Sequence, residues 1–109
     1  MFATIRRYTA KDPGTTKEIF ASLKRRIEEK FVPTLQDVPG FHCYYVIESD
    51  KHELVTVSLF ESRAGAQEST RRAAEFVRND PLKDQLSAPE VIQGDLLVSK
   101  EAMAGAHSA

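Results

Sequence analysis

Cysteine, tryptophan and long apolar runs are scarce or missing in this sequence. Cys43 is the only cysteine, and there is no tryptophan among the 109 residues. One cysteine cannot form a disulfide or a Cys-based zinc site within its own chain. No apolar run approaches the ~20 residues that cross a bilayer, and the N-terminus lacks the apolar core of a signal peptide. These absences argue against a disulfide scaffold and a membrane partner, and they favour the reducing cytoplasm.

An excess of charge of one sign is also missing. The chain has 15 basic and 16 acidic residues, interspersed along its length, for a formal net charge of −1. Nucleic acid is therefore not expected as a partner. With 41% hydrophobic and 28% charged residues, the composition is that of an ordinary globular domain. We predict a single domain over residues 1–101, followed by a disordered tail over 102–109.

The first third of the sequence predicts a strand and a helix. Residues 2–9 alternate in character and are followed by turn-forming residues in "KDPGTT". Thr15 and Glu18 have the spacing of a capping box, so the helix should start there. Pro33 and the Pro39-Gly40 pair should end this helix and its exit loop. The helix carries an apolar stripe at three- and four-residue steps, made of Ile19, Phe20, Leu23, Ile27 and Phe31.

The remainder predicts a hairpin, a second helix and a last strand. Segments 41–48 and 53–61 flank a short polar turn, and Ser62 is placed to cap a helix over 63–79. The inner side of that helix is small, so it can lie close on a sheet or leave room for a ligand. Apolar residues from 91 to 98 mark the last strand, with a bulge expected at Gly94. The order βαββαβ predicts an α+β, ferredoxin-like fold: a four-stranded antiparallel sheet with both helices on one face.

Alternation along the hairpin divides its side chains between two faces. We expect the helices to cover the face of Phe41, Cys43, Tyr45, Ile47, Val55, Val57 and Leu59. The other face is too apolar to stay in water, and a second copy related by a two-fold axis is its simplest cover. This predicted dimer face consists of His42, Tyr44, Val46, Leu54, Thr56, Ser58 and Phe60.

The middle of the chain, residues 38–80, resembles a known family. The stretch "VPGFHCYYVIESDKHELVTVSLFESRAGAQESTRRAAEFVRND" has Pro39-Gly40-Phe41 before the second strand, and "SLFESRAGAQEST" where the third strand passes into a helix. Both are similar to antibiotic biosynthesis monooxygenase-like (ABM) domains of the dimeric α+β barrel superfamily. With the outer strands, the resemblance covers about residues 2–100. It implies a homodimer of face-packed sheets, with a pocket in each subunit between the helices and the sheet.

Two branches of that family are better understood, and the sequence departs from both. Haem-degrading members have an asparagine on the first strand, and a tryptophan and a histidine associated with the second helix. This chain has Arg6 and Arg7 on the first strand, no histidine in the second helix and no tryptophan, which disfavours haem degradation. Cofactor-independent oxygenases of polycyclic aromatic phenols tend to use Asn, Trp, Tyr and Arg around the substrate. Only tyrosine and arginine are available in suitable strands here.

The run "HCYY", residues 42–45, raises the question of a reactive site. His42 and Cys43 are adjacent on a strand, so they point to opposite faces and cannot act together as base and nucleophile. His42 and His52 would lie roughly 20 Å apart along the hairpin, too far to share a metal ion. We therefore predict no metal site and no cofactor, and we interpret the run as part of the folded wall.

A largely apolar ligand pocket with a few polar groups is expected between helices and sheet. Its predicted lining is Phe20, Leu23, Cys43, Tyr45 and Phe76. An inward arginine could stabilise a phenolate, and alternation lets only one of Arg6 and Arg7 point inward. The catalytic candidates, if the protein is an enzyme, are Arg6, Arg7, His42 and Tyr45.

Two functions stay open at this point. One is a cofactor-independent monooxygenase acting on an aromatic or apolar small molecule. The other is a non-catalytic dimeric module that binds a small molecule or has a purely structural task. A closed, ligand-sized cavity with a strand arginine or histidine directed into it would favour the first. A pocket filled by Phe20, Phe76 and Tyr45 would favour the second.

Overall fold

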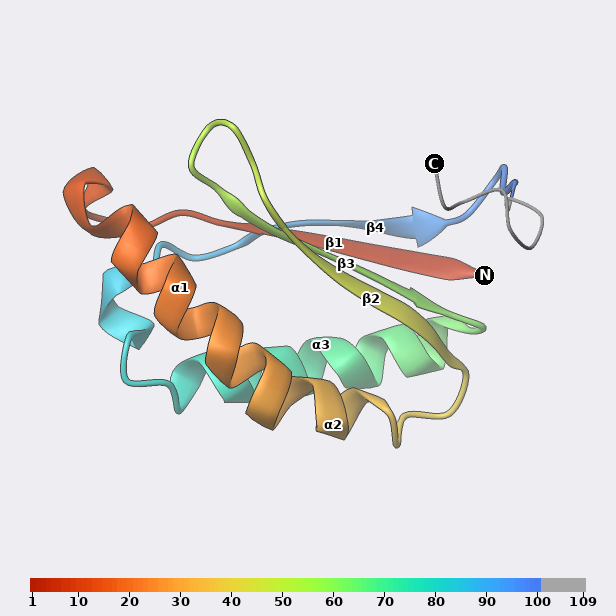
Figure 1. Ribbon diagram of the computed structural model, residues 1–109. Helices are drawn as coiled ribbons and strands as arrows, with labels where there is room; N and C mark the ends of the chain where they lie inside the picture. The colour runs from red at the N-terminus through yellow and green to blue at the C-terminus, as the bar shows by residue number, and fades with distance from the viewer. Residues whose placement is uncertain (101–109) are drawn as a thin grey trace, which may run out of the picture.

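An antiparallel sheet forms one layer of the molecule (Figure 1). The computed structural model describes residues 1–100, so the predicted tail at 102–109 lies outside the described residues. Within them the strands are β1 (Phe2–Tyr8), β2 (Phe41–Glu48), β3 (Leu54–Phe60) and β4 (Glu90–Asp95), in the spatial order β2-β3-β1-β4. β1 is therefore central and pairs with both β3 and β4.

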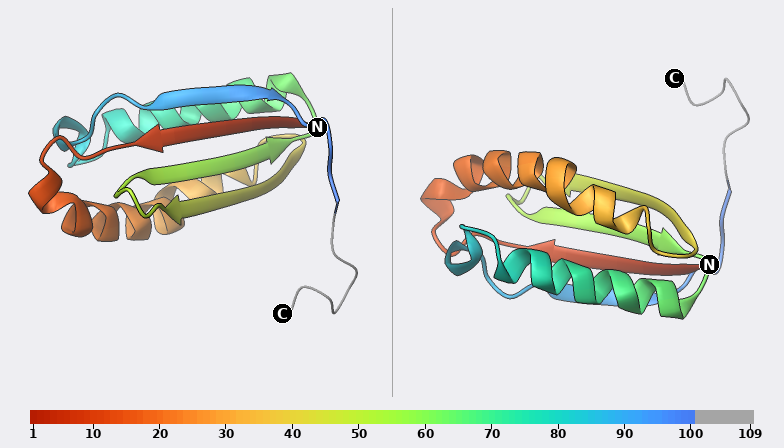
Figure 2. Two further views of the ribbon diagram at one scale, coloured as in Figure 1. Left: turned by 90° about the horizontal axis from the view of Figure 1, so that it is seen from above. Right: turned by 90° about the horizontal axis from the view of Figure 1, so that it is seen from below.

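Helices form a second layer on one face of the sheet. α1 (Thr16–Arg26), the π-helical turn η2 (Ile27–Phe31) and α2 (Val32–Leu35) follow one another as a continuous rod, and α3 (Arg63–Arg78) lies beside it. Figure 2 shows the strands in front when the molecule is seen from above, and the helices in front when it is seen from below. This layering and the order βαββαβ confirm the predicted ferredoxin-like fold.

Asp12, rather than Thr15, caps the first helical segment. Its Oδ1 accepts a hydrogen bond from the Gly14 N–H at 3.0 Å and starts the short 3-10 turn η1 (Pro13–Thr15). The Thr15 hydroxyl instead donates to the Asp12 carbonyl, and it makes no capping bond to α1. The reciprocal side-chain bonds of the predicted capping box are therefore wrong, although Thr15 is the N-cap residue and α1 begins at Thr16, where the sequence predicted. Pro13 is pre-set for a first helical position and starts the helical geometry one turn early.

The rod passes through Pro33 instead of ending there. In a regular α-helix the ring of Pro33 would clash with the carbonyl four residues back, and the residue has no N–H to donate. The π-helical turn directly before it is wider, and the Val32 N–H donates to the carbonyl of Ile27. The predicted helix end at Pro33 is therefore wrong, and the helical rod continues to Leu35. Such π-helical turns are frequent at functional sites.

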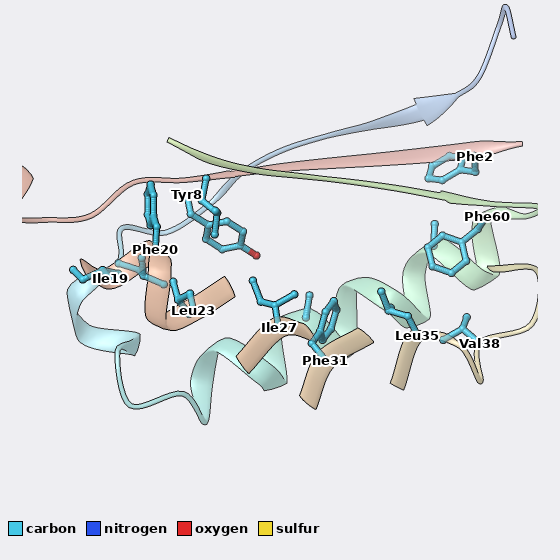
Figure 3. Close-up of a cluster of buried hydrophobic side chains, with 14 residues drawn as sticks. Phe2, Tyr8, Ile19, Phe20, Leu23, Ile27, Phe31, Leu35, Val38 and Phe60 are labelled. Atoms are coloured by element: carbon cyan, nitrogen blue, oxygen red, sulfur yellow. The ribbon is translucent and has the colours of Figure 1, made fainter. Parts of the chain in front are cut away.

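The core is a row of side chains along this rod. Figure 3 shows residues from Ile19 to Leu35 pointing toward the sheet, with Tyr8 near one end and Phe2 and Phe60 near the other. All members of the predicted apolar stripe are buried. α3 contributes small buried residues, and a Cβ built on Gly65 would come within 2.8 Å of the Pro39 carbonyl oxygen. The small inner side of α3 thus permits its close approach.

The two faces of the sheet are interchanged relative to the prediction. Leu54, Thr56, Ser58 and Phe60 are buried beneath the helices of their own chain, so they cannot form the predicted dimer face. Tyr44 pairs with Ser58 and Val46 with Thr56, which places both on the helix side as well. The error arose because the sequence reasoning gave the helices the more apolar face. The helices in fact cover the face that carries hydroxyls.

A β-bulge in β2 explains part of this interchange. The register shifts between Phe41 and Cys43, which places Phe41 beside Phe60 on the helix side but Cys43 opposite Leu59 on the other side. The extra residue, His42, is exposed. The bulge predicted at Gly94 is wrong, because Gly94 pairs with Ala3 in unbroken register. β4 also ends earlier than predicted, at Asp95. One further backbone hydrogen bond follows it, from the Leu96 N–H to the Met1 carbonyl at 2.9 Å.

Candidate functional site

A small cavity lies between the helices and the sheet and is here called the inner cavity. Apolar side chains form most of its lining, among them Leu23, Ile27, Phe31, Phe76 and Val77. It leaves about 30 Å³ of free space, which is room for one or a few water molecules. Its polar groups come from the sheet: Arg6 and Tyr8 from β1, Tyr44 from β2 and Thr56 from β3.

Arg6 is the unusual member of this lining. It is only 4% exposed and lies on β1, one of the two inner strands of the sheet. One guanidinium nitrogen, Nη2, donates to the Thr70 hydroxyl of α3 at 2.6 Å. Burial lowers the pKa of Arg6, and no described carboxylate forms an ion pair with it. A buried cation without a counter-charge costs several kcal/mol relative to water.

Two tyrosines share the inner cavity with this cation. Burial raises the pKa of Tyr8 and of Tyr44, while the nearby Arg6 charge acts in the opposite direction. The Tyr44 hydroxyl also forms a hydrogen bond with Thr56. Both phenols are therefore neutral at physiological pH and present O–H donors. Figure 3 shows Tyr8 descending from β1 toward the helical rod.

Two phenylalanines separate the inner cavity from a wider outer groove. Phe31 at the end of η2 and Phe76 of α3 have ring centroids 5.3 Å apart, and both line the two spaces. Phe31 also meets Tyr44 edge to face at 5.7 Å. The outer groove lies between the rod and α3 and holds about 520 Å³ on the same measure. Its walls carry both signs of charge, from Arg26, Arg71 and Arg72 and from Asp37, Glu75 and Asp80.

The side of the sheet away from the helices is apolar and uncovered in one chain. We call it the open face, and register and alternation assign to it Ala3, Ile5, Arg7, Cys43, Tyr45, Ile47, Val55, Val57, Leu59, Glu90 and Ile92. Tyr45 is 59% exposed and Ile92 57%. Arg7 forms ion pairs with Glu53 and Glu90, so its charge is balanced.

The structure brings together only some of the predicted site residues. Leu23 and Phe76 line the inner cavity, and Arg6 is the arginine that points inward. Phe20 is buried in the core without lining that cavity. Cys43 and Tyr45 lie on the open face, so their prediction as pocket residues is wrong. Arg7 also lies on the open face, and His42 is exposed at the bulge.

Sequence reasoning missed Tyr8, Thr56 and Thr70. Tyr8 follows Arg6 by two residues on the same strand, and Thr56 pairs directly with Arg6 across the sheet. Both positions follow from alternation and register once Arg6 is placed inward. Thr70 comes from α3, and only the packing of that helix on the sheet brings it near.

Sequence comparison finds no match to this chain among known family profiles, nor a significant match among curated proteins. Within residues 1–100, no helix is long and apolar enough to cross a membrane. No group of three His, Cys, Asp or Glu side chains gathers there as a metal site would require.

Comparison of structures, in contrast, finds the same fold in several proteins. A structure from Nitrosomonas europaea, described provisionally as an antibiotic biosynthesis monooxygenase, has a TM-score of 0.67 at 19% identity, covering 90% of this chain and 100% of that one. The haem degrader MhuD from Mycobacterium tuberculosis, with two haems in its active site, has a TM-score of 0.68 at 12% identity, covering 93% and 100%. A dimeric ferredoxin-like protein from an uncultured marine organism has a TM-score of 0.67 at 14% identity, covering 94% and 98%. Similarity at these identities shows a shared fold.

Proposed function

We propose that this chain is an ABM-like homodimeric protein that binds an aromatic or apolar small molecule between its helices and its sheet. The observation that carries this proposal is the inner cavity, in which donor groups from three strands converge inside an apolar lining. Clefts of this composition are the usual form of small-molecule sites. The fold shared with a provisionally described monooxygenase supports the same conclusion.

The open face supports the homodimer. Apolar side chains from all four strands meet there, and a second copy would bury them by packing the same face against itself. The dimeric ferredoxin-like protein of the same fold supports this arrangement. Cys43 lies on this face as a free thiol, which supports placing the dimer in the reducing cytoplasm. Sedimentation at micromolar concentration should give a particle of twice the 12.2 kDa chain mass, and a stable monomer would contradict the dimer.

Catalysis in this pocket would be cofactor-independent oxygenation. In such a reaction the substrate supplies the electrons, one oxygen atom of O₂ enters it and the other leaves as water. The enzyme contributes orientation and stabilises the substrate anion. Arg6 is suited to the second task, because a buried cation lowers the pKa of a bound phenol.

One observation favours the alternative of a non-catalytic binding module. The residues that line the inner cavity include no histidine, aspartate, glutamate or cysteine. With the pKa values of Tyr8 and Tyr44 raised, no lining side chain is a base at neutral pH. An oxygenase here would therefore act on a substrate acidic enough to lose its proton to water.

Haem does not fit the inner cavity. Its lining holds no histidine, cysteine or methionine for axial ligation. A tyrosine ligand would have to ionise, which burial of Tyr8 and Tyr44 opposes.

Oxygen consumption separates the two functions. The purified dimer would be mixed with a panel of phenols and anthrones in an oxygen electrode, and each compound would be tested for binding by calorimetry. An oxygenase consumes O₂ only with a compound that binds, and Arg6→Met should abolish that consumption. A binding module binds without consuming O₂. Failure of the whole panel to bind would contradict the proposed small-molecule site.

A further inference from the structure

The charge of Arg6 has no counter-charge in the described chain, whereas other arginines in the sheet and core do. Arg7, the next residue on β1, pairs with Glu53 and Glu90. Arg26 pairs with Asp80 at 2.6 Å, and that carboxylate is almost fully buried. Arg6 is 4% exposed, yet the polar side chains found near it among the described residues are neutral, namely Thr70, Tyr8 and Tyr44. Burying a charge without a counter-charge is costly, so a buried arginine in this environment lacks an anionic partner.

We propose that the inner cavity is a binding site for the anionic group of an aromatic or apolar acid, a carboxylate or a phenolate, with Arg6 as its counter-ion. This inference rests on the proposed small-molecule site and specifies the charge of its ligand. A guanidinium has five N–H donors, and one nitrogen of Arg6 is engaged, at Thr70. The other donors are available to the two oxygen atoms of a carboxylate, the geometry to which a guanidinium is best matched.

Tyr8 and Tyr44 add further hydrogen-bond donors for an anion beside Arg6. Tyr8 and Tyr44 both interact electrostatically with Arg6 and line the same cavity. Neutral phenols can donate hydrogen bonds, and donors held in a site that excludes water stabilise negative charge. The remaining lining is apolar, so the rest of the ligand should be apolar or aromatic.

The ligand must widen the site to enter. About 30 Å³ of free space does not hold an aromatic ring, since occupied small-molecule sites span several hundred Å³. The Phe31–Phe76 pair is the wall shared with the outer groove of about 520 Å³. A flat acid whose carboxylate lies at Arg6 would therefore pass between these two rings, with its far end in the groove.

Two probes of equal shape test the charge directly. 2-Naphthoate and 2-naphthamide differ in charge and little else, and their binding to the dimer can be measured by calorimetry. We expect naphthoate to bind at least ~10-fold more tightly, the effect of one charge-assisted hydrogen bond. Arg6→Met should remove this preference, Arg6→Lys should keep part of it, and Arg25→Met, on the exposed side of α1, should leave it unchanged. Circular dichroism would verify that each variant is folded.

The outcomes distinguish the two proposals. Equal binding of both probes to the wild-type protein would overturn the anionic-ligand inference and leave the small-molecule site standing. A preference for naphthoate that survives in Arg6→Met would also overturn it, because the anion would then lie elsewhere. If neither probe binds, even to Phe76→Ala with its wall opened, both the inference and the proposed site fail.

Discussion

Arg26 and Arg6 are both largely removed from water, but only one of them carries its own counter-charge. Arg26, at the end of α1, directs two nitrogens at the Asp80 carboxylate at 2.6 and 2.9 Å. Asp80 also accepts the Leu82 N–H at 2.9 Å, and its hydrogen bond raises the pKa of Arg26. Within the described part of the chain, Arg6 has one hydrogen-bond partner, the neutral Thr70 hydroxyl, and burial lowers its pKa. Arg26 therefore stabilises the fold through its own ion pair, whereas Arg6 lacks a counter-charge that the proposed anionic ligand would supply.

The largest effect should come from breaking the balanced pair. Arg26→Met leaves Asp80 buried without a cation, which should lower the free energy of unfolding by about 3 kcal/mol. Urea denaturation followed by circular dichroism measures this change. Arg25→Met, on the exposed side of the same helix, should cost no more than about 0.5 kcal/mol. Equal costs in the two variants would show that the Arg26–Asp80 pair does not anchor the helix end.

The buried Tyr44 hydroxyl near Arg6 should make the free energy of unfolding depend on pH in the alkaline range. Tyr44 has its pKa raised by burial above the ordinary value of 10.0, so the folded state keeps a proton that the unfolded state loses. Its contribution is complete below pH 10 and falls by about 1.4 kcal/mol for each pH unit above that. Tyr44→Phe should flatten this decline in urea denaturation between pH 10 and 11. Identical slopes in the two proteins would contradict a buried neutral Tyr44.

Thr4, on the helix-covered side of the sheet, should have a smaller effect on stability. Its hydroxyl is fully buried beside the helices and has no hydrogen-bond partner among residues 1–100. Thr4→Val removes this unsatisfied group at constant shape and should raise the free energy of unfolding by about 1 kcal/mol. Thr56→Val removes the hydrogen bond to Tyr44 and should lower it. A loss in both variants would indicate that Thr4 has a bonding role in solution.

The fold followed from the sequence because each element carried its own local signal. The stripe from Ile19 to Phe31, the cap at Ser62 and the hairpin at 41–60 each fix an element, and their order leaves few topologies. The helix through Pro33 was missed because a π-helical turn leaves no mark in the spacing of apolar residues.

The candidate site was harder to predict than the fold. A strand pattern defines two faces but does not say which one a helix will cover, and the β-bulge at His42 breaks the alternation on which the assignment depended. Arg6 and Arg7 look alike in sequence. The tertiary structure distinguishes them. The strand register places Glu90 opposite Arg7, whose charge is thereby balanced, whereas helix packing places the neutral Thr70 beside Arg6.

The most direct measurement is the stability of the wild-type protein and of Arg6→Met, with and without 2-naphthoate. Without the acid, Arg6→Met should be as stable as the wild type or more stable by about 1 kcal/mol, because it removes an uncompensated buried charge. With the acid in large excess, the wild type should gain stability by mass action and overtake the variant. An Arg6→Met protein destabilised as severely as Arg26→Met, and a wild type unmoved by the acid, would contradict the account.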